Sequence, residues 1–198
     1  MAKIAVLGWG SLIWCPKSLR LGSPWHRGGP LLPIEFARQS KGERVTLVLV
    51  PDAKLQPTFW ALSEFPELGL AIDNLRDREG ARRRDIHWLG PEDEQADGVP
   101  PKIANPIRTW LEKHTELGAV IWTGLPPKWE EAVGRCPTPG DVITYLEKLM
   151  KREASADAEE YIRNTPKELE TDVRELVVQR FGWEHNPLPT TLFSDEPG

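Results

Sequence analysis

Near its start the chain carries a short apolar run that stops at two closely spaced glycines, Lys-Ile-Ala-Val-Leu-Gly-Trp-Gly-Ser-Leu over residues 3–12. The run at 4–7 is typical of a buried β-strand. Gly8 and Gly10 are predicted to supply backbone angles that other residues resist. A Gly-X-Gly-Ser turn after a strand can expose several backbone N–H groups together, which suits a carboxylate or an oxyanion. The alternative is an ordinary first strand that ends in a glycine turn.

The better-known glycine motifs do not fit this turn. A dinucleotide-binding Gly-x-Gly-x-x-Gly needs a third glycine where Ile13 stands, and Pro16 interrupts the helix that should follow. No Gly-Lys-Ser/Thr follows, as a phosphate-binding P-loop requires. A Gly-x-Ser-x-Gly nucleophile elbow is excluded because Ser11 directly follows Gly10. The turn therefore belongs to none of these three classes of site.

Composition narrows the classes of function. A chain of 198 residues can bury the core of one domain, with or without an appendage. The net charge of −5 argues against a general nucleic-acid binder. Cys15 and Cys136 are too few for a disulfide framework, and the four histidines are scattered, so we expect no metal site. Without a signal peptide or a membrane-length apolar segment, we expect a cytoplasmic protein with no membrane partner.

Strand patterns dominate the first part of the chain and helical patterns the second. Strands are expected at 4–7, 33–40, 44–50, 58–62, 86–89 and 119–123, and helices at 66–78 and 103–117. An acidic loop is expected at 90–101. Because most strands precede most helices, the order favours an α+β fold over a doubly wound α/β sheet.

Capping signals predict two further helices. Thr138 followed by Pro139 predicts a helix that extends to about residue 152. Thr165 with Glu168 predicts a capping box for a helix that Gly182 ends. We therefore expect a core over residues 1–136 and a helical appendage over 137–198 packed on it, with a loose tail from about residue 186.

Three short motifs occur in a fixed order. Residues 6–14 read Val-Leu-Gly-Trp-Gly-Ser-Leu-Ile-Trp, residues 36–40 read Phe-Ala-Arg-Gln-Ser, and residues 75–80 read Leu-Arg-Asp-Arg-Glu-Gly. Together they resemble the γ-glutamylcyclotransferase superfamily, whose glutathione-specific branch has the closest glycine signature and a similar aromatic-x-Arg-x-Ser strand. The third motif is similar to the segment that carries the family's catalytic glutamate. The resemblance covers about residues 3–90 and continues more weakly to 123.

The resemblance implies a small mixed β-barrel with flanking helices and an intramolecular acyl transfer. The α-amine of a γ-glutamyl group attacks its own γ-carbonyl, which releases 5-oxoproline and the amine partner without a metal or cofactor. Such a reaction needs a base for the ammonium proton, donors for the oxyanion and a folded pose of the glutamyl chain. The implied partner is a small γ-glutamyl amine or peptide.

The resemblance makes Glu79 the catalytic base, which later returns a proton to the leaving amine. Arg38 is the candidate partner of the substrate's α-carboxylate, with Ser40 on the same strand. The turn is the candidate for binding the glutamyl carboxylate or the oxyanion, through Gly8, Trp9, Gly10, Ser11 and Leu12. The alternatives are structural: an exposed glutamate in a charged cluster, a turn-closing serine and a solvated arginine.

The chain departs from the family pattern at several positions. Trp9 stands where the family has a tyrosine, so the aromatic ring is kept and the phenol hydroxyl is lost. Ala61 replaces a glycine, and no tyrosine follows Glu79. Three functions therefore remain open: the cyclotransferase, a non-catalytic small-molecule-binding module on the same fold, and a protein-interaction role for residues 137–198.

Overall fold

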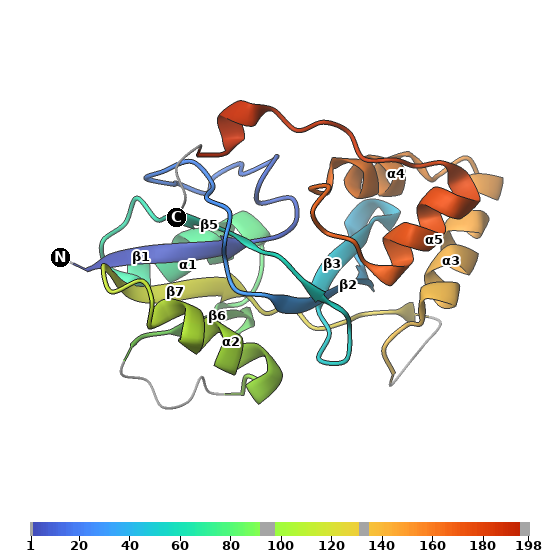
Figure 1. Cartoon of the computed structure of the whole chain (residues 1–198). Helices are drawn as coiled ribbons and strands as arrows, with labels where there is room; N and C mark the ends of the chain where they lie inside the picture. Colours follow the sequence, from blue (N-terminus) through green and yellow to red (C-terminus); the bar gives the residue numbers. More distant parts are fainter. Residues whose placement is uncertain (1, 92–97, 131–134, 195–198) are drawn as a thin grey trace. The chain divides into compact units, whose positions relative to one another are not determined.

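The computed structural model describes residues 2–91, 98–130 and 135–194 (Figure 1). In these ranges the chain has a mixed α+β fold with two sheets and five α-helices. It divides into two compact units, Met1–Leu32 with Pro57–Leu125 and Pro189–Gly198, and Pro33–Gln56 with Pro126–Leu188. No helix in the described ranges combines the length and the apolar character that a membrane span requires.

The first unit is built on a four-stranded sheet with the order β5-β1-β7-β6. Its strands are β1 (Lys3–Gly8), β5 (Phe59–Leu62), β6 (Ile86–Leu89) and β7 (Leu117–Thr123). β1 runs antiparallel to β5 and parallel to β7, and β6 runs antiparallel to β7. The four strands predicted in this part of the chain are confirmed, with ends that differ by one or two residues.

Two helices accompany this sheet, α1 (Leu68–Glu79) and α2 (Pro101–Leu111), and both contact β6 and β7. Ala71, Ile72 and Leu75 recur at helical spacing on α1 and are buried. α1 ends at Gly80, which has the left-handed φ of 60° that glycine adopts without strain. The predicted helix at 103–117 ends earlier than expected because Leu117 pairs with β1 instead. Part of the expected acidic loop, residues 92–97, lies outside the described residues.

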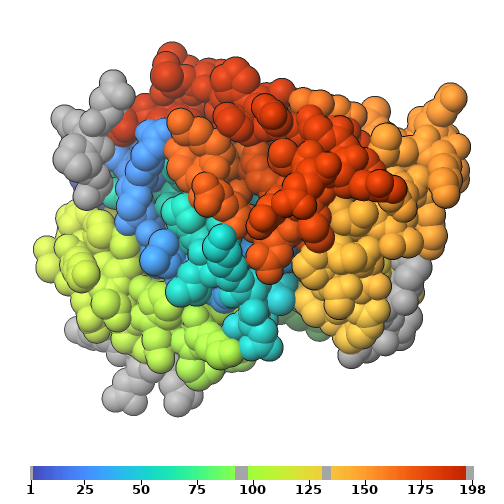
Figure 2. Space-filling model, turned by 45° about the vertical axis from the view of Figure 1, so that its right-hand side comes forward, coloured from blue at the N-terminus to red at the C-terminus, as the bar shows by residue number. Residues whose placement is uncertain are grey.

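The second unit contains a three-stranded sheet with the order β3-β2-β4 and three helices. The elements are β2 (Leu32–Gln39), β3 (Val45–Leu49), β4 (Leu55–Gln56), α3 (Pro139–Lys151), α4 (Ala156–Asn164) and α5 (Asp172–Phe181). The strands predicted at 33–40 and 44–50 are confirmed. α3 packs against α5, as the adjoining surfaces in Figure 2 show.

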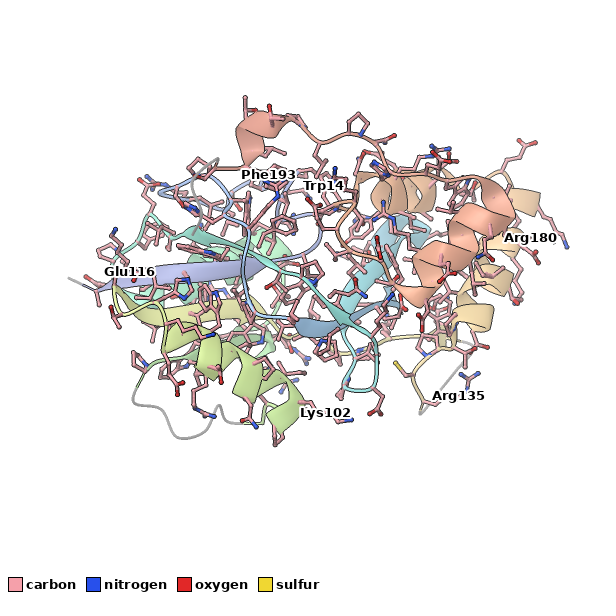
Figure 3. All side chains as sticks on the ribbon, in the orientation of Figure 1. Trp14, Lys102, Glu116, Arg135, Arg180 and Phe193 are labelled. Carbon is pink, nitrogen blue, oxygen red and sulfur yellow. The ribbon has the colours of Figure 1, made fainter. Side chains whose placement is uncertain are left out.

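Polar side chains fix the start of α3 and its contact with α5. Thr138 caps α3 as predicted, since its hydroxyl accepts a hydrogen bond from the Asp141 N–H. Arg135 lies beside this cap (Figure 3) and, together with the hydrogen bonds from Thr138, holds the pKa of the Asp141 carboxyl well below its usual range. Arg180 of α5 reaches Glu147 of α3 at 2.8 Å.

The capping box predicted at Thr165 is wrong. The Thr165 hydroxyl donates to the carbonyl of Tyr161, so this residue closes α4 instead of opening the next helix. The buried guanidinium of Arg174 donates to carbonyls of the segment that follows, which holds that segment as a loop. α5 begins only after Thr171, its N-cap, and ends at Gly182 as predicted.

The boundaries of the two compact units differ from the domain boundary expected at residue 136. β2, β3 and β4 group with α3, α4 and α5, so residues of the expected 1–136 core and of the expected 137–198 appendage share one unit. The division at 136 stays a prediction about domains. Part of the tail expected to be loose from about residue 186 is packed, because Leu192 and Ser194 hydrogen-bond to the backbone of Trp25.

Gly8 is required by packing and not by its backbone conformation. The expectation that Gly8 and Gly10 supply unusual angles is wrong, because neither has a positive φ. A Cβ at Gly8 would instead lie 2.6 Å from Cη2 of Trp25, whose indole ring is buried against the end of β1. The glycine therefore allows an aromatic ring to approach the backbone closely.

We expect Gly8→Ala to lower the free energy of unfolding by about 1–3 kcal/mol, because the methyl group overpacks against Trp25. Urea denaturation measures this change. Gly140→Ala is the control, since the nearest atom to its added Cβ is 3.8 Å away, and it should leave stability unchanged or raise it by about 0.5–1 kcal/mol. A Gly8→Ala protein as stable as the wild type would contradict the packing role.

Candidate functional site

The turn that follows β1 has four consecutive backbone N–H groups with no acceptor in the part of the chain that the structure describes. The turn folds back on itself, because Ile13 N donates to Gly10 O at 3.0 Å and Cys15 N donates to Ser11 O at 2.9 Å. The N–H groups of residues 9–12 have no hydrogen-bond acceptor within the described residues. Backbone donors in buried positions are usually paired. This turn can therefore donate to a ligand carbonyl or carboxylate.

Arg78 joins this turn to Glu79, the predicted base. Its Nη1 donates to Glu79 Oε1 at 2.7 Å, and its Nη2 donates to Ser11 Oγ at 3.0 Å and to the Cys15 carbonyl at 2.7 Å. Arg78 and Glu79 end α1, just before the left-handed Gly80 turns the chain away. A single guanidinium thus connects the predicted base and the predicted binding turn.

Glu79 is not an exposed member of a charged cluster. Its side chain is 15% exposed and that of Arg78 is 7% exposed, whereas the neighbouring Asp77 is 63% exposed. The last turn of α1 therefore directs Arg78 and Glu79 into the protein while Asp77 faces solvent. A shielded ion pair is stronger than an exposed one, because solvent screens it less.

The parallel pairing of β1 and β7 adds Thr123, a residue that the sequence did not single out. The pairing of the two strands ends at Val6 and Ile121, and Thr123 is the last residue of β7, two residues past that pair. The Thr123 Oγ1 atom is buried and has no hydrogen-bond partner within the described residues. The sequence predicts a strand at 119–123, but it does not reveal that this strand runs parallel to β1. Thr123 is therefore a further candidate, found only from the sheet topology.

If the Thr123 hydroxyl makes no structural hydrogen bond, Thr123→Val should stabilise the protein. Valine keeps the shape and removes an unpaired buried polar group, so we expect a gain of about 1 kcal/mol in the free energy of unfolding. Thermal and urea denaturation measure the gain. Thr190→Val, at an exposed threonine, serves as the control and should stay within about 0.5 kcal/mol of the wild type. A loss of stability in Thr123→Val would show that the hydroxyl has a structural partner.

His87 and Trp122 form a pair on the other face of the sheet, because neighbouring residues of a strand point to opposite sides. They are cross-strand partners with ring centroids 5.9 Å apart. Gly124 lies against the imidazole so closely that an added Cβ would overlap His87 Cδ2. Burial lowers the pKa of His87 from its usual 6.5, and the nearby Asp85 opposes this only in part.

This lowered pKa makes stability depend on pH. The unfolded chain binds a proton on His87 near pH 6.5 that the folded chain does not yet bind, so the free energy of unfolding should fall as the pH falls below about 6.5. The contribution of one proton is at most about 1.4 kcal/mol per pH unit. His87→Gln should remove it, which urea denaturation between pH 5 and 7.5 measures. Parallel curves for wild type and variant would contradict the assignment.

Arg38 and Ser40 belong to the second unit, whereas the turn, Arg78 and Glu79 belong to the first. Arg38 lies on β2 opposite Thr46, and its Nη1 donates to the Pro126 carbonyl at 2.6 Å. Ser40 N donates to Arg44 O at 2.9 Å, and the Ser40 side chain does not cap the short helix that follows. Of the predicted residues, the structure brings together the turn and Glu79, and it gives Arg38 and Ser40 local contacts within their own unit.

Two other features bear on a ligand site. Within the described residues, no three His, Cys, Asp or Glu side chains gather where they could hold a metal ion. A hollow of about 250 Å³ in the first unit is lined by residues that include Lys3, Ser63 and Phe65. It lies at the amino-terminal end of β1, whereas the turn follows the carboxyl end, so it is not part of the site around Arg78.

Comparison of the chain with protein-family models, curated proteins and solved structures finds no significant match. The resemblance to the γ-glutamylcyclotransferases therefore rests on the three short motifs. Any function for this chain has to be argued from those motifs and from the arrangement of the turn, Arg78 and Glu79.

Proposed function

We propose that the chain is a γ-glutamylcyclotransferase-like enzyme that converts a small γ-glutamyl amine or peptide to 5-oxoproline and releases the amine. The observation that supports this most is the link from Ser11 through Arg78 to Glu79. It sets a mostly buried carboxylate close to a turn whose backbone N–H groups have no acceptor among the described residues. A base and a group of oxyanion donors are the two requirements of this cyclisation.

In the proposed reaction Glu79 takes a proton from the α-ammonium of the substrate. Arg78 engages Oε1 of Glu79, which leaves Oε2 for this step. The amine then attacks the γ-carbonyl carbon and closes a five-membered ring, and the carbonyl oxygen becomes an oxyanion that the N–H groups of residues 9–12 stabilise. When this intermediate collapses, the bond to the leaving nitrogen breaks and Glu79 returns the proton to that nitrogen. The chemistry consumes no metal or cofactor.

The finer fold assignment belongs to the same proposal. The motifs support a mixed β-barrel of the γ-glutamylcyclotransferase type. A cytoplasmic location, with a small substrate as the partner and no nucleic acid, stays a prediction from composition and charge.

Release of 5-oxoproline from a panel of γ-glutamyl amines, γ-glutamyl amino acids and glutathione tests the activity. Glu79→Gln should lower kcat by about 10²- to 10⁴-fold on every active substrate, because the amide cannot accept the proton. Glu67→Gln is the matched control, since Glu67 is exposed at the start of α1 and its side chain makes no capping bond. Circular dichroism confirms that both variants fold. Full turnover in Glu79→Gln would refute the assignment of the base.

A non-catalytic binding module is the second candidate, and one observation favours it. The Glu79 carboxylate is already engaged in a shielded ion pair, which competes with its use as a base. The substitutions at Trp9 and Ala61 point in the same direction. Thermal stabilisation by a γ-glutamyl compound without any release of 5-oxoproline would support the binding module, whereas Glu79-dependent turnover would exclude it.

A further inference from the structure

Within the described residues, the end of β1 pairs with one strand only. Pairing with β7 ends at Val6, whereas pairing with β5 continues to Gly8, whose partner is Phe59. Gly8 directly precedes the turn of residues 9–12. The buried indole of Trp25 also packs here, since a Cβ at Gly8 would lie 2.6 Å from its Cη2 atom. The start of the turn therefore depends on what holds Phe59 and Trp25 in place.

A segment far along the chain, residues 189–194, pairs with Trp25, and we call this segment the strap. Trp25 N donates to Leu192 O at 2.9 Å, and Ser194 N donates to Trp25 O at 2.8 Å. Phe193, which lies between these two bonds, forms a parallel bridge with Trp25. The strap and the turn belong to the same compact unit. The strap therefore fixes the backbone of the residue whose indole packs on β1.

Phe193 is the side chain that anchors the strap (labelled in Figure 3). Its ring centroid lies 5.3 Å from that of Phe59, the β5 partner of Gly8. The guanidinium carbon of Arg27 lies 4.6 Å from the centroid of the same ring. Aromatic pairs and cation–π contacts are both favourable beyond the area that they bury. Phe193 thus joins the strap to both residues that contact Gly8.

The turn has little else to hold its start. Its internal backbone bonds, within the described residues, are those donated by Ile13 and Cys15. Arg78 adds bonds to the Ser11 hydroxyl and to the Cys15 carbonyl, so it fixes the later part of the turn. The earlier part is held through Gly8. Segments with few bonds of their own open locally when an outside contact is lost.

We propose that the strap positions the turn, with Phe193 holding Trp25 and Phe59 against Gly8. When the strap detaches, the turn loosens and its N–H groups lose their fixed arrangement. Phe193 is therefore a positioning residue for a site near the other end of the sequence. The strap is argued from these contacts alone, and only its effect on catalysis rests on the proposed function, in which the turn stabilises the oxyanion.

Amide hydrogen exchange measured by NMR tests the strap without any substrate. Phe193→Leu keeps an apolar side chain and loses the ring, so the N–H groups of Ile13 and Cys15 should exchange roughly 10-fold faster through local opening of the turn. The Gly124 N–H donates to Asp85 O at 2.8 Å in the same unit and should keep its wild-type rate. Phe193→Ala should enlarge the effect on the turn.

Phe181→Ala is the matched control. Phe181 is another half-buried phenylalanine, and its ring centroid lies 5.0 Å from that of Trp183 in the second unit. This variant should leave the exchange of the two turn amides unchanged, and melting temperatures show that the variants fold. Unchanged turn amides in Phe193→Leu would overturn the inference. Equal acceleration at Gly124 would also overturn it, because it would reveal a general loss of stability.

Steady-state kinetics adds a readout that a general loss of stability would not move. If a γ-glutamyl compound is converted, Phe193→Leu should lower kcat roughly 10-fold and leave KM within about twofold, because oxyanion donors act in the transition state. The two proposals can fail separately. No turnover by the wild type refutes the enzyme, while the exchange rates still decide on the strap. Turnover with an unchanged kcat in Phe193→Leu supports the enzyme and refutes the positioning role.

Discussion

The central position of β1 in the four-stranded sheet determines what the first unit can present to a ligand. β1 pairs with β5 on one side as far as Gly8 and with β7 on the other as far as Val6, so pairing from both sides holds most of the strand. The turn of residues 9–12 starts where this strand ends, and its N–H groups have no acceptor among the residues that the structure describes. Donors held in advance stabilise a developing negative charge without reorganisation, which a loose loop could not do.

Local sequence patterns predicted most helices and strands, but they could not predict contacts between residues far apart in the chain. The strands at 4–7 and 86–89 and the helix that carries Leu75 follow from periodicity alone. The capping box at Thr165 failed because Arg174, nine residues away, binds the carbonyls of that segment and competes with a helix start. The sequence singled out Gly8, but for the wrong reason. A side chain is excluded there because a Cβ would collide with Trp25, and not because Gly8 has an unusual φ.

The same holds for the candidate site: its continuous segments could be predicted from the sequence, and the contacts between them could not. A motif comparison could single out the turn and Glu79, because each is a short continuous segment. The sequence could not reveal that Arg78 reaches Ser11 across 67 residues, or that the strand carrying Thr123 runs parallel to β1, since both depend on how separate segments pair. Arg76 and Arg78 look equivalent in sequence, and only the position of the last turn of α1 makes the Arg76 side chain 33% exposed and the Arg78 side chain 7% exposed.

The contact between Trp25 and the backbone near residue 193 has a consequence for how the chain reaches its folded state. The backbone of Trp25, whose indole packs on Gly8, is hydrogen-bonded to Leu192 and Ser194. β1 also pairs with β7, which lies more than a hundred residues later in the chain. Sheets that depend on such distant pairings form slowly, because the loop between the partners must close first. The turn after the first strand is thus among the earliest segments to be synthesised and among the last to acquire its final surroundings.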